Sequence, residues 1–318
     1  MTVMVLGTGG LIGDAIAQGL MAADVPTLCV SRNARGPAGI KTVAGDRLDP
    51  HLIASLVERF DITCIIDVIA YTEAGSLPLF ETLAPRLERY VLISSCDVYR
   101  NYGRLHRLDQ GSPDIGLLNE NAPLRAGRYP YRGATMRAPD DPDGWMDHYD
   151  KLPLEDAVRA SFDKWTILRL PMVYGPGDRQ HRFRWIIQPL RTGIDELPVP
   201  TNWLNWVSTY GFSLNVGAAV AAAACHSATV KRTFNVTDCS PVSHRQWIER
   251  FSSRIGWTGN IRADDDPQSP FAQRLASLDL TVPLALDGSA LRSIIPGIPA
   301  VDLDTALDAT IESESLPV

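Results

Sequence analysis

The chain has 318 residues, of which 45% are hydrophobic and 21% are charged, and its formal net charge is −7. These values are ordinary for a folded globular protein, and an acidic chain has no general attraction to nucleic acid or to an anionic membrane. No apolar run reaches the roughly 18 residues needed to span a membrane. The five scattered cysteines contain no Cys-x-x-Cys pair, which argues against a disulfide framework or a zinc site and favours a cytoplasmic location.

The first 44 residues predict a strand, a glycine-rich turn, a helix and two further strands. Residues 3–6 are apolar and lack a basic leader, so we expect a buried strand rather than a signal peptide. Gly7-Thr8-Gly9-Gly10-Leu11-Ile12-Gly13 follows directly, and apolar residues from Ala15 to Met21 continue at helical spacing. The next two strands are predicted at 27–30 and 41–44.

The glycine-rich turn has the sequence context of a site for a dinucleotide pyrophosphate. Glycines let the turn close and let backbone N–H groups approach the phosphates, while the helix N-terminus presents partial positive charge. The second strand ends about twenty residues further on, where the ribose of such a ligand is usually bound. Gly7, Gly10 and Gly13 are therefore predicted to shape a dinucleotide site, and a glycine turn without a ligand is the alternative.

Strand-like and helix-like runs alternate as far as residue 175, which predicts a parallel sheet covered on both faces. The later elements are predicted as helices at 52–60, 79–87, 151–162 and 217–224, and as strands at 64–70, 90–95, 165–170 and 233–236. Residues 100–148 are rich in Pro, Gly, Arg and Asp and have no sustained period. So long an irregular stretch is typical of a lid or a binding loop.

Four segments, in the same order, resemble the extended short-chain dehydrogenase/reductase family, which includes sugar-nucleotide epimerases and dehydratases. The glycine turn resembles the family's G-x-x-G-x-x-G fingerprint, although Leu6 stands where the family often has Thr. Residues 94–99 resemble its S-S-x-x-V-Y strand end, 168–177 resemble its L-R-x-x-x-V-Y-G-P signature, and 233–236 resemble its later F-N-V strand.

The resemblance implies an α/β fold of the Rossmann type, with a doubly wound parallel sheet and a smaller C-terminal substrate-binding lobe. It implies a dinucleotide-binding domain at 1–175, to which 210–238 is expected to return. The substrate-binding lobe is then expected at 176–209 and 239–318.

The end of the second strand predicts NADP as the cofactor. NAD enzymes place an acidic residue on the ribose 2′-hydroxyl here, whereas this chain has Ser31, Arg32 and, close behind, Arg35. A carboxylate would repel a 2′-phosphate, and a guanidinium can hold it through paired hydrogen bonds. NADP is therefore preferred over NAD, and solvated loop arginines are the alternative.

The residues predicted to bind the cofactor come from the glycine turn and from the ends of strands. Asp46 resembles the family's G-D pair, whose Asp contacts adenine, although an aspartate here can also cap a turn. The full predicted set is Gly7, Thr8, Gly10, Leu11, Ile12, Gly13, Ser31, Arg32, Arg35, Asp46, Arg47, Val68, Ile69, Ala70, Lys151, Pro171 and Val173. No metal is predicted, because His181 and His244 have no partner at ligand spacing.

Ser95 and Lys151 stand where the family places catalytic residues. Ser95 ends a parallel strand at the edge where ligands bind, and its hydroxyl is expected to donate to a carbonyl oxygen. Lys151 with Glu155 resembles the family's K-x-x-x-E, so Lys151 is expected to hold the nicotinamide ribose and to supply positive charge. The family's Tyr, four residues before that Lys, is replaced here by Asp147.

The missing Tyr leaves the general acid open between several groups. Residues two apart on a helix point about 200° apart, so Tyr149 can replace the missing Tyr only if it precedes the helix. Pro153 favours this arrangement, because proline is tolerated only in a helix's first turn and so predicts a start around 150–153. Tyr149 is therefore the preferred donor, and Asp147 would need burial to keep its proton at neutral pH. The remaining candidates are Tyr129, Tyr131, a substrate hydroxyl and an ordered water.

Met172 and the aromatic residues beyond 175 bear on the substrate. Sugar-nucleotide enzymes of the family commonly carry Asn where Met172 stands, and a thioether cannot donate a hydrogen bond. This weighs against a nucleotide-sugar substrate. Four aromatic residues in the following segment either stack on a flat or apolar substrate or form the core of a small lobe: Phe183, Trp185, Trp203 and Trp206.

The leading functional hypothesis is an NADP(H)-dependent reductase or dehydrogenase that acts on a carbonyl or alcohol of a small to medium organic molecule. The alternatives are a sugar epimerase or dehydratase that uses its cofactor transiently, and an NADP-binding regulator or scaffold without catalysis. Retention of Ser95 and Lys151 favours an enzyme, whereas the loss of Tyr at 147 favours a binding protein. The expected partners are a small-molecule substrate and a second copy of the chain in a homodimer, with neither nucleic acid nor membrane.

Overall fold

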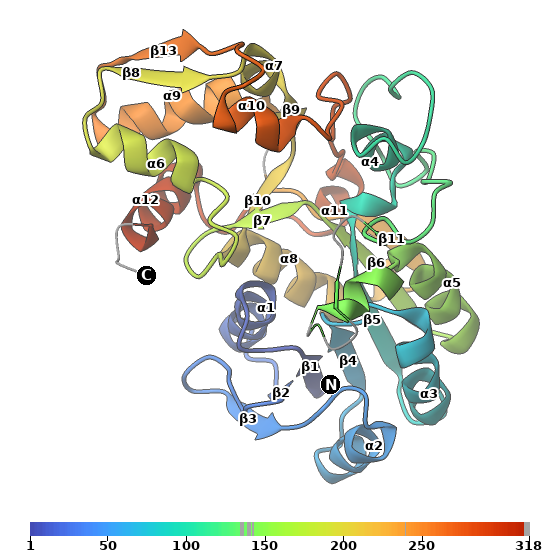
Figure 1. Ribbon diagram of the computed structural model, residues 1–318. Coiled ribbons are helices and arrows are strands. Elements are labelled where there is room, and N and C mark those ends of the chain that lie inside the picture. The colour runs from blue at the N-terminus through green and yellow to red at the C-terminus, as the bar shows by residue number, and fades with distance from the viewer. Residues whose placement is uncertain (134–136, 139–140, 142, 239, 315–318) are drawn as a thin grey trace.

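A seven-stranded parallel sheet organises the computed structural model, which describes residues 1–133, 137–138, 141, 143–238 and 240–314. The strand order is β11-β6-β5-β4-β1-β2-β3, and every neighbouring pair runs parallel (Figure 1). The strands are β1 (Val3–Leu6), β2 (Thr27–Ser31), β3 (Lys41–Ala44), β4 (Cys64–Asp67), β5 (Arg89–Ser95), β6 (Trp165–Leu170) and β11 (Arg232–Asn235). The order reverses between β1 and β4, which is the place where such sheets bind ligands.

Helices cover both faces of the sheet because the strands are apolar on both sides. In β1, Val3 and Val5 face a core shared with α1, α8 and α11, while Met4 and Leu6 face a core shared with α2, α3 and α5. The helices are α1 (Leu11–Ala22), α2 (Pro50–Arg59), α3 (Glu73–Leu83), α5 (Lys151–Ser161), α8 (Ser213–Cys225) and α11 (Ser289–Ile294). The doubly wound, Rossmann-type sheet predicted from the sequence is confirmed.

Three local predictions can be compared directly with the elements. The alanine run predicted as a helix is part of α8, which packs along α1. The strand predicted at 64–70 is shorter, because β4 ends at Asp67 and residues 68–70 form a loop beside the site described below. Cys29 and Cys64 are fully buried in the sheet as small apolar residues, and Cys239 lies outside the described residues.

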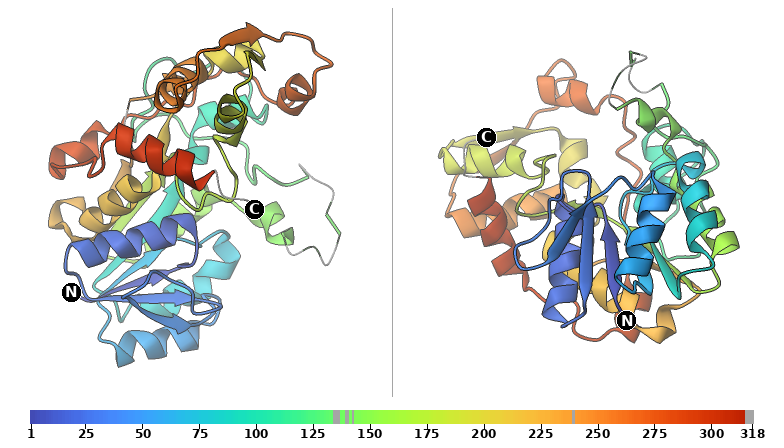
Figure 2. Two further views of the ribbon diagram at one scale, coloured as in Figure 1. Left: turned by 90° about the vertical axis from the view of Figure 1, so that its left-hand side faces the viewer. Right: turned by 90° about the horizontal axis from the view of Figure 1, so that it is seen from below.

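A second group of elements lies above the sheet and forms a lobe with its own core (Figures 1 and 2). Three short strand pairs support it: β7 (Met172–Tyr174) with β10 (Tyr210–Phe212), β8 (Glu196–Val199) with β13 (Asn260–Ala263), and β9 (Val207–Ser208) with β12 (Val242–Ser243). Its helices are α6 (Arg184–Arg191), α7 (Thr201–Asn205), α9 (His244–Ile255), α10 (Pro270–Leu275) and α12 (Leu303–Ser313).

Three of the four predicted aromatic residues beyond 175 pack in the core of this lobe, and Trp206 belongs to the adjoining apolar cluster that includes residues of η1 (Cys96–Val98) and α4 (Arg100–Leu105). Phe183 packs against Trp247, with ring centroids 4.8 Å apart, and Trp203 stacks on Trp206 at 5.2 Å. Trp185 contacts Trp203 and completes the group. None of the four predicted aromatics lines the cavity that the described residues form around the sheet edge. Of the two interpretations, the lobe core is therefore correct.

The described residues between 100 and 148 contain little regular structure, as predicted. The exceptions are α4 (Arg100–Leu105) and the 3-10 turn η2 (Gly144–His148), while a further turn η1 (Cys96–Val98) directly precedes the segment. Arg125 fastens this stretch to the sheet domain, because its Nε donates to the Asp97 carbonyl at 2.8 Å and its Nη2 donates to the Asp150 carboxylate at 3.0 Å. Within the described chain, no helix has both the length and the apolar character that crossing a membrane requires.

Candidate active site

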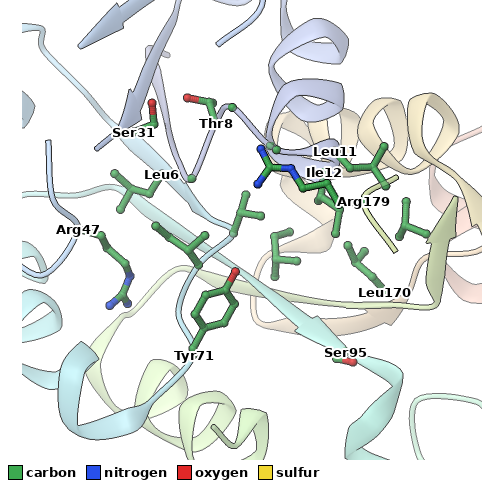
Figure 3. Close-up of a pocket in the computed structure, with 18 of the residues that line it drawn as sticks. Leu6, Thr8, Leu11, Ile12, Ser31, Arg47, Tyr71, Ser95, Leu170 and Arg179 are labelled. Atoms are coloured by element: carbon green, nitrogen blue, oxygen red, sulfur yellow. The ribbon is translucent and has the colours of Figure 1, made fainter. Parts of the chain in front are cut away.

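A cavity of about 980 Å³ follows the carboxyl ends of β1, β2, β4 and β5 (Figure 3). Its walls are the glycine turn, the loops after β2, β3 and β4, the end of β5, the start of α5 and the β7–α6 loop. The cavity therefore spans the point where the strand order reverses. In open α/β sheets, this is the expected position of a dinucleotide.

The glycine turn forms a cradle that side chains would fill. Gly7 has φ +101°, which favours glycine, and a Cβ on Gly13 would lie 2.2 Å from the Gly7 carbonyl oxygen. Helix α1 begins after Gly10 without a side-chain cap, and a Cβ on Gly10 would meet no atom within 4 Å. The open space at an uncapped helix N-terminus fits a dinucleotide pyrophosphate.

The loop after β2 is held by short hydrogen bonds while its arginines face the cavity. The Arg35 carbonyl accepts from the Thr8 and Ser31 hydroxyls, both at 2.8 Å, and the Ser31 oxygen accepts from the Arg35 N–H at 2.7 Å. The side chains of Arg32 and Arg35 are exposed and line the cavity. Asp46 also lines it, and its carboxylate accepts from the Leu48 N–H at 2.9 Å, so it caps the turn at the same time.

Arg47 is a buried member of the cavity wall (Figure 3). Its Nε donates to the Asp67 carboxylate at 2.7 Å and its Nη2 donates to the Ser76 hydroxyl at 2.8 Å. The Tyr90 hydroxyl donates to the same Asp67 oxygen. The polar atoms of Arg47 thus bind protein groups, a pairing that the sequence prediction of a cofactor contact did not include.

Lys151 lies at the centre of the cavity wall and is 4% exposed. Its Nζ donates to the carbonyls of Ala70 at 2.6 Å and Ile93 at 2.9 Å, so the side chain joins the end of β5 to the loop after β4. An ammonium has three N–H donors, and the third is left for a ligand. Burial lowers the pKa of Lys151 to about 8. Ala70 itself orients Lys151 through its carbonyl.

Tyr149 and Asp97 form a buried pair beside Lys151. Helix α5 begins at Lys151 with Asp150 as its N-cap, so Tyr149 precedes the helix in extended backbone, as Pro153 predicted. The Tyr149 hydroxyl donates to the Asp97 carboxylate at 2.7 Å, and both residues line the cavity. Burial raises the pKa of the Asp97 carboxyl, and burial together with the Asp97 charge raises the pKa of Tyr149 well above its usual value.

The other predicted catalytic groups have different surroundings. Ser95 lines the cavity at the end of β5, where its hydroxyl oxygen accepts from the Asp97 N–H at 3.2 Å (Figure 3). The Asp147 carboxylate accepts from Arg137 at 2.6 Å and does not line the cavity. Tyr131 lines the cavity and its hydroxyl bonds that of Tyr102 at 2.8 Å. Tyr129 lies under the Arg132 guanidinium, 3.8 Å from the ring centroid.

An aromatic wall faces this group, and two of its four rings, Tyr71 and Trp145, were not predicted from the sequence. Tyr71 stacks on Trp145 with ring centroids 4.4 Å apart, and Tyr149 lies 6.1 Å from Tyr71 and 5.2 Å from Tyr131. All four rings line the cavity. Tyr71 lies in the loop after β4 and Trp145 in the short turn η2, so no periodicity in the sequence marks either residue. Asp97 was also missed, although a carboxylate two residues after Ser95 in the strand-end motif is a usable signal.

Arg179 is a further cavity residue that the sequence prediction did not include. It belongs to the loop between β7 and α6 and lines the cavity together with Leu11 and Ile12 from the start of α1 (Figure 3). Arg182 from the same loop also lines the cavity and pairs with Asp178 at 2.6 Å. These guanidinium groups, with Arg32 and Arg35, make the cavity suited to an anionic ligand.

The two histidines considered as metal ligands have protein partners instead. His244 lies between Trp203 and Tyr210, and burial lowers its pKa to about 3. His181 lies 3.0 Å from the Glu314 carboxylate. Across the described ranges, no three His, Cys, Asp or Glu side chains are grouped so that they could hold a metal ion.

Solved structures resemble this chain over its whole length. UDP-glucose 4-epimerase from Thermus thermophilus, solved with NAD, has a TM-score of 0.67 at 19% identity and covers 100% of both chains. UDP-glucuronic acid 4-epimerase from Bacillus cereus, solved with UDP-glucuronic acid and NAD, has a TM-score of 0.68 at 15% identity over 99% of each chain. The chain has the epimerase/dehydratase fold.

A solved dehydratase is similar to this chain to the same degree. dTDP-glucose 4,6-dehydratase from Bacillus anthracis, solved with NAD, has a TM-score of 0.67 at 14% identity and covers 99% of this chain and 96% of its own. No protein-family model matches the sequence, and no curated protein matches it. The epimerase/dehydratase fold thus confirms the architecture that the resemblance implied, and the chemistry has to be derived from the site.

Proposed function

We propose that this chain is a nicotinamide-dinucleotide-dependent oxidoreductase that acts on an alcohol or carbonyl group of a small to medium organic molecule. The observation that carries the proposal is that one cavity contains both the glycine cradle and the Lys151, Asp97 and Tyr149 cluster. A bound nicotinamide dinucleotide supplies or accepts the hydride. The protein groups bind and orient the two ligands, exclude water and hold the proton that accompanies the hydride.

The chain's own residues divide this work between them. The glycine cradle at residues 7–13 would hold the pyrophosphate. The third N–H of the Lys151 ammonium would donate to a ribose hydroxyl. Ser95 at the end of β5 would orient the substrate oxygen. The aromatic wall of Tyr71, Trp145, Tyr149 and Tyr131 favours a flat or apolar substrate.

NADP(H) is the proposed form of the cofactor. The two epimerases and the dehydratase compared above were solved with NAD. In this chain, however, Ser31 and Arg32 stand at the end of β2 without a carboxylate, and the exposed arginines there line the cavity. A 2′-phosphate would find two guanidinium partners and no repelling charge in this loop.

Transient oxidation, as in an epimerase or dehydratase, is the second candidate. The likeness to nucleotide-sugar enzymes over the whole chain favours it. Met172, where Asn would bind a substrate nucleotide, is half-buried against the lobe core and does not line the cavity. This favours a substrate without a nucleotide for either reaction.

The test combines cofactor titration with turnover. NADPH and NADH are titrated by fluorescence, and the loaded protein is then mixed with a panel of aromatic and aliphatic aldehydes and ketones. Net loss of NADPH supports a reductase. Epimerisation or dehydration of an alcohol such as a sugar by the protein loaded with NADP⁺, without net change in the cofactor, supports transient oxidation. Dinucleotide binding without reduction or transient oxidation of any substrate indicates a regulator or scaffold. If the protein binds neither NADPH nor NADH, the proposal is contradicted.

A further inference from the structure

Asp97 is a carboxylate inside the cavity to which neither the family resemblance nor the fold comparison gives a role. Its side chain is 2% exposed and comes from η1, two residues after Ser95. One carboxylate oxygen, Oδ2, accepts the Tyr149 hydroxyl at 2.7 Å. The other oxygen, Oδ1, is buried without a hydrogen-bond partner among the described residues.

A buried carboxylate oxygen without a partner needs an explanation. Leaving such a group unsatisfied is costly, and native proteins rarely do so unless a ligand, a water or a bound proton completes the site. Among the residues that the structure describes, Asp97 forms no ion pair: Arg125 donates from Nε to the Asp97 backbone carbonyl and from Nη2 to the Asp150 carboxylate. Asp97 lines the cavity, so a ligand bound there can donate the hydrogen bond that Oδ1 lacks.

We propose that Asp97 is the catalytic proton acceptor and donor of this site, acting directly on the substrate oxygen, and that Tyr149 positions it. This inference rests on the proposed function. In the oxidation direction, the substrate C–H bond breaks and its electron pair leaves as hydride to the oxidised dinucleotide. The substrate O–H bond breaks, its proton passes to Asp97 Oδ1, and the C=O double bond forms. In the reduction direction, neutral Asp97 returns the proton to the oxygen.

The charges around Asp97 suit a group that gains and loses a proton. The titratable side chains that face it come from η1 itself, α4, the irregular segment before η2, the end of η2 and the start of α5: Cys96, Tyr102, Arg125, Tyr131, Tyr149 and Lys151. Burial raises the pKa of Asp97. The Tyr149 hydrogen bond, the charges of Arg125 and Lys151 and the nearby Ser95 hydroxyl offset this only in part. A raised carboxyl pKa brings the group closer to the neutral pH at which proton transfer is efficient.

Tyr149 is less suited to act as the acid itself. Its one hydroxyl hydrogen is already donated to Asp97, and its pKa lies well above the usual phenol value. Giving that hydrogen to a substrate would break the hydrogen bond and leave a buried phenolate beside a carboxylate. Asp147, the other candidate, is bound to Arg137 outside the cavity. Asp97 is therefore the cavity group that can exchange a proton without leaving two adjacent buried negative charges.

The experiment compares Asp97→Asn and Tyr149→Phe with the control Asp147→Asn, which makes the same change outside the cavity. The first readout does not need turnover. Infrared difference spectra record the C=O stretch of a protonated carboxyl, and absorbance titration records tyrosine ionisation. We expect a carboxyl band that persists above the usual aspartate range, is absent in Asp97→Asn and is retained in Asp147→Asn. We also expect Tyr149 to ionise at lower pH in Asp97→Asn, because a negative neighbour has been removed.

The second readout is the single-turnover hydride-transfer rate with NADPH and an aromatic ketone from the panel. Asp97→Asn should bind NADPH like the wild type but slow transfer by roughly 10²–10⁴, the usual contribution of a general acid. Tyr149→Phe should slow hydride transfer less than Asp97→Asn does and should shift the pH profile of the rate, because Tyr149 only positions Asp97.

Three results would overturn the inference. The first is the absence of the carboxyl band, the second is hydride transfer within about threefold of wild type in Asp97→Asn, and the third is a larger loss in Tyr149→Phe than in Asp97→Asn. Failure of the wild type to bind either dinucleotide is a separate outcome, because it contradicts the proposed function itself.

Discussion

Arg125 and Asp150 form an ion pair in which neither side chain has any exposed surface, with Nη2 and Oδ1 3.0 Å apart. The same Asp150 carboxylate caps α5 by accepting the Leu152 N–H, and it accepts the Tyr129 N–H, both at 3.0 Å. The Asp150 carboxylate therefore connects the long irregular segment to the start of the helix that carries Lys151. The positions of Tyr149 and Lys151, on either side of Asp150, depend on these hydrogen bonds.

Replacing Asp150 by Ala should destabilise the protein strongly. Removing one partner of a buried ion pair leaves an uncompensated charge, which typically costs about 3–5 kcal/mol of the free energy of unfolding. Asp156→Ala is the control, because Asp156 is in the same helix but 72% exposed in its pair with Arg159, and such pairs contribute about 0–1 kcal/mol. Urea unfolding measures both. Equal losses in the two variants would contradict a structural role for the Arg125–Asp150 pair.

Two glycines of the turn should respond differently to alanine. A Cβ on Gly13 would lie 2.2 Å from the Gly7 carbonyl oxygen, whereas a Cβ on Gly10 meets nothing within 4 Å and Gly10 has an ordinary extended φ of −134°. Overpacking of this kind costs about 1–3 kcal/mol or more, so Gly13→Ala should lower the melting temperature. Gly10→Ala should fold like the wild type but bind NADPH less tightly, because its methyl group enters the cradle. Thermal unfolding and NADPH titration distinguish the two effects, and a stable Gly13→Ala variant would refute the packing argument.

Local pattern was sufficient to predict the parts of the fold and site that depend on neighbouring residues. The apolar runs of β1 and β2, the glycine turn and the start of α5 at Lys151 could be predicted, because each depends on residues close in sequence. Pro153 restricts the first turn of the helix and so placed Tyr149 outside it. The carboxyl ends of parallel strands also lie at the same edge of the sheet, so Ser95 could be assigned to the ligand site from the sequence alone.

Contacts across the irregular segment were beyond sequence reasoning. Asp97 and Tyr149 are 52 positions apart, and the chain between them has no period that sets a register. Arg47 is among the residues predicted to bind the cofactor, but its partner Asp67 lies at the end of β4, 20 positions further along the chain. The same reason explains why Trp185 and Trp203 belong to the lobe core, while Tyr71 and Trp145 form the cavity wall.

Arg32 should determine the choice of cofactor. The Arg32 side chain is exposed and lines the cavity at the end of β2, so a 2′-phosphate can bind it. Loss of a charge-assisted hydrogen bond costs roughly 1.5–3 kcal/mol. Arg32→Ala should therefore weaken NADPH by about ten- to a hundredfold and leave NADH nearly unchanged. Arg191→Ala, an exposed arginine at the end of α6 that does not line the cavity, is the control. Equal or better binding of NADH by the wild type would rule out NADP preference.

Lys151 should make dinucleotide binding depend on pH. Burial lowers its pKa to about 8, so the free protein carries an ammonium below that pH and a neutral amine above it. The ammonium attracts the anionic dinucleotide, and NADPH affinity should fall as pH rises through about 8, by up to ten- to a hundredfold if the charge-assisted contact is lost. Lys151→Met should bind weakly on both sides of this pH without the step.

Stability should change with pH in the opposite direction, which separates the binding effect from unfolding. The pKa of Lys151 is lowered from 10.5, so between about 8 and 10.5 the unfolded chain holds the proton more readily than the folded one. The contribution of Lys151 to the free energy of unfolding therefore rises with pH over that window. Urea unfolding of wild type and Lys151→Met at each pH isolates this contribution, and NADPH titration follows the affinity. A wild-type affinity that stays constant through pH 8, or a step that persists in Lys151→Met, would show that another group titrates.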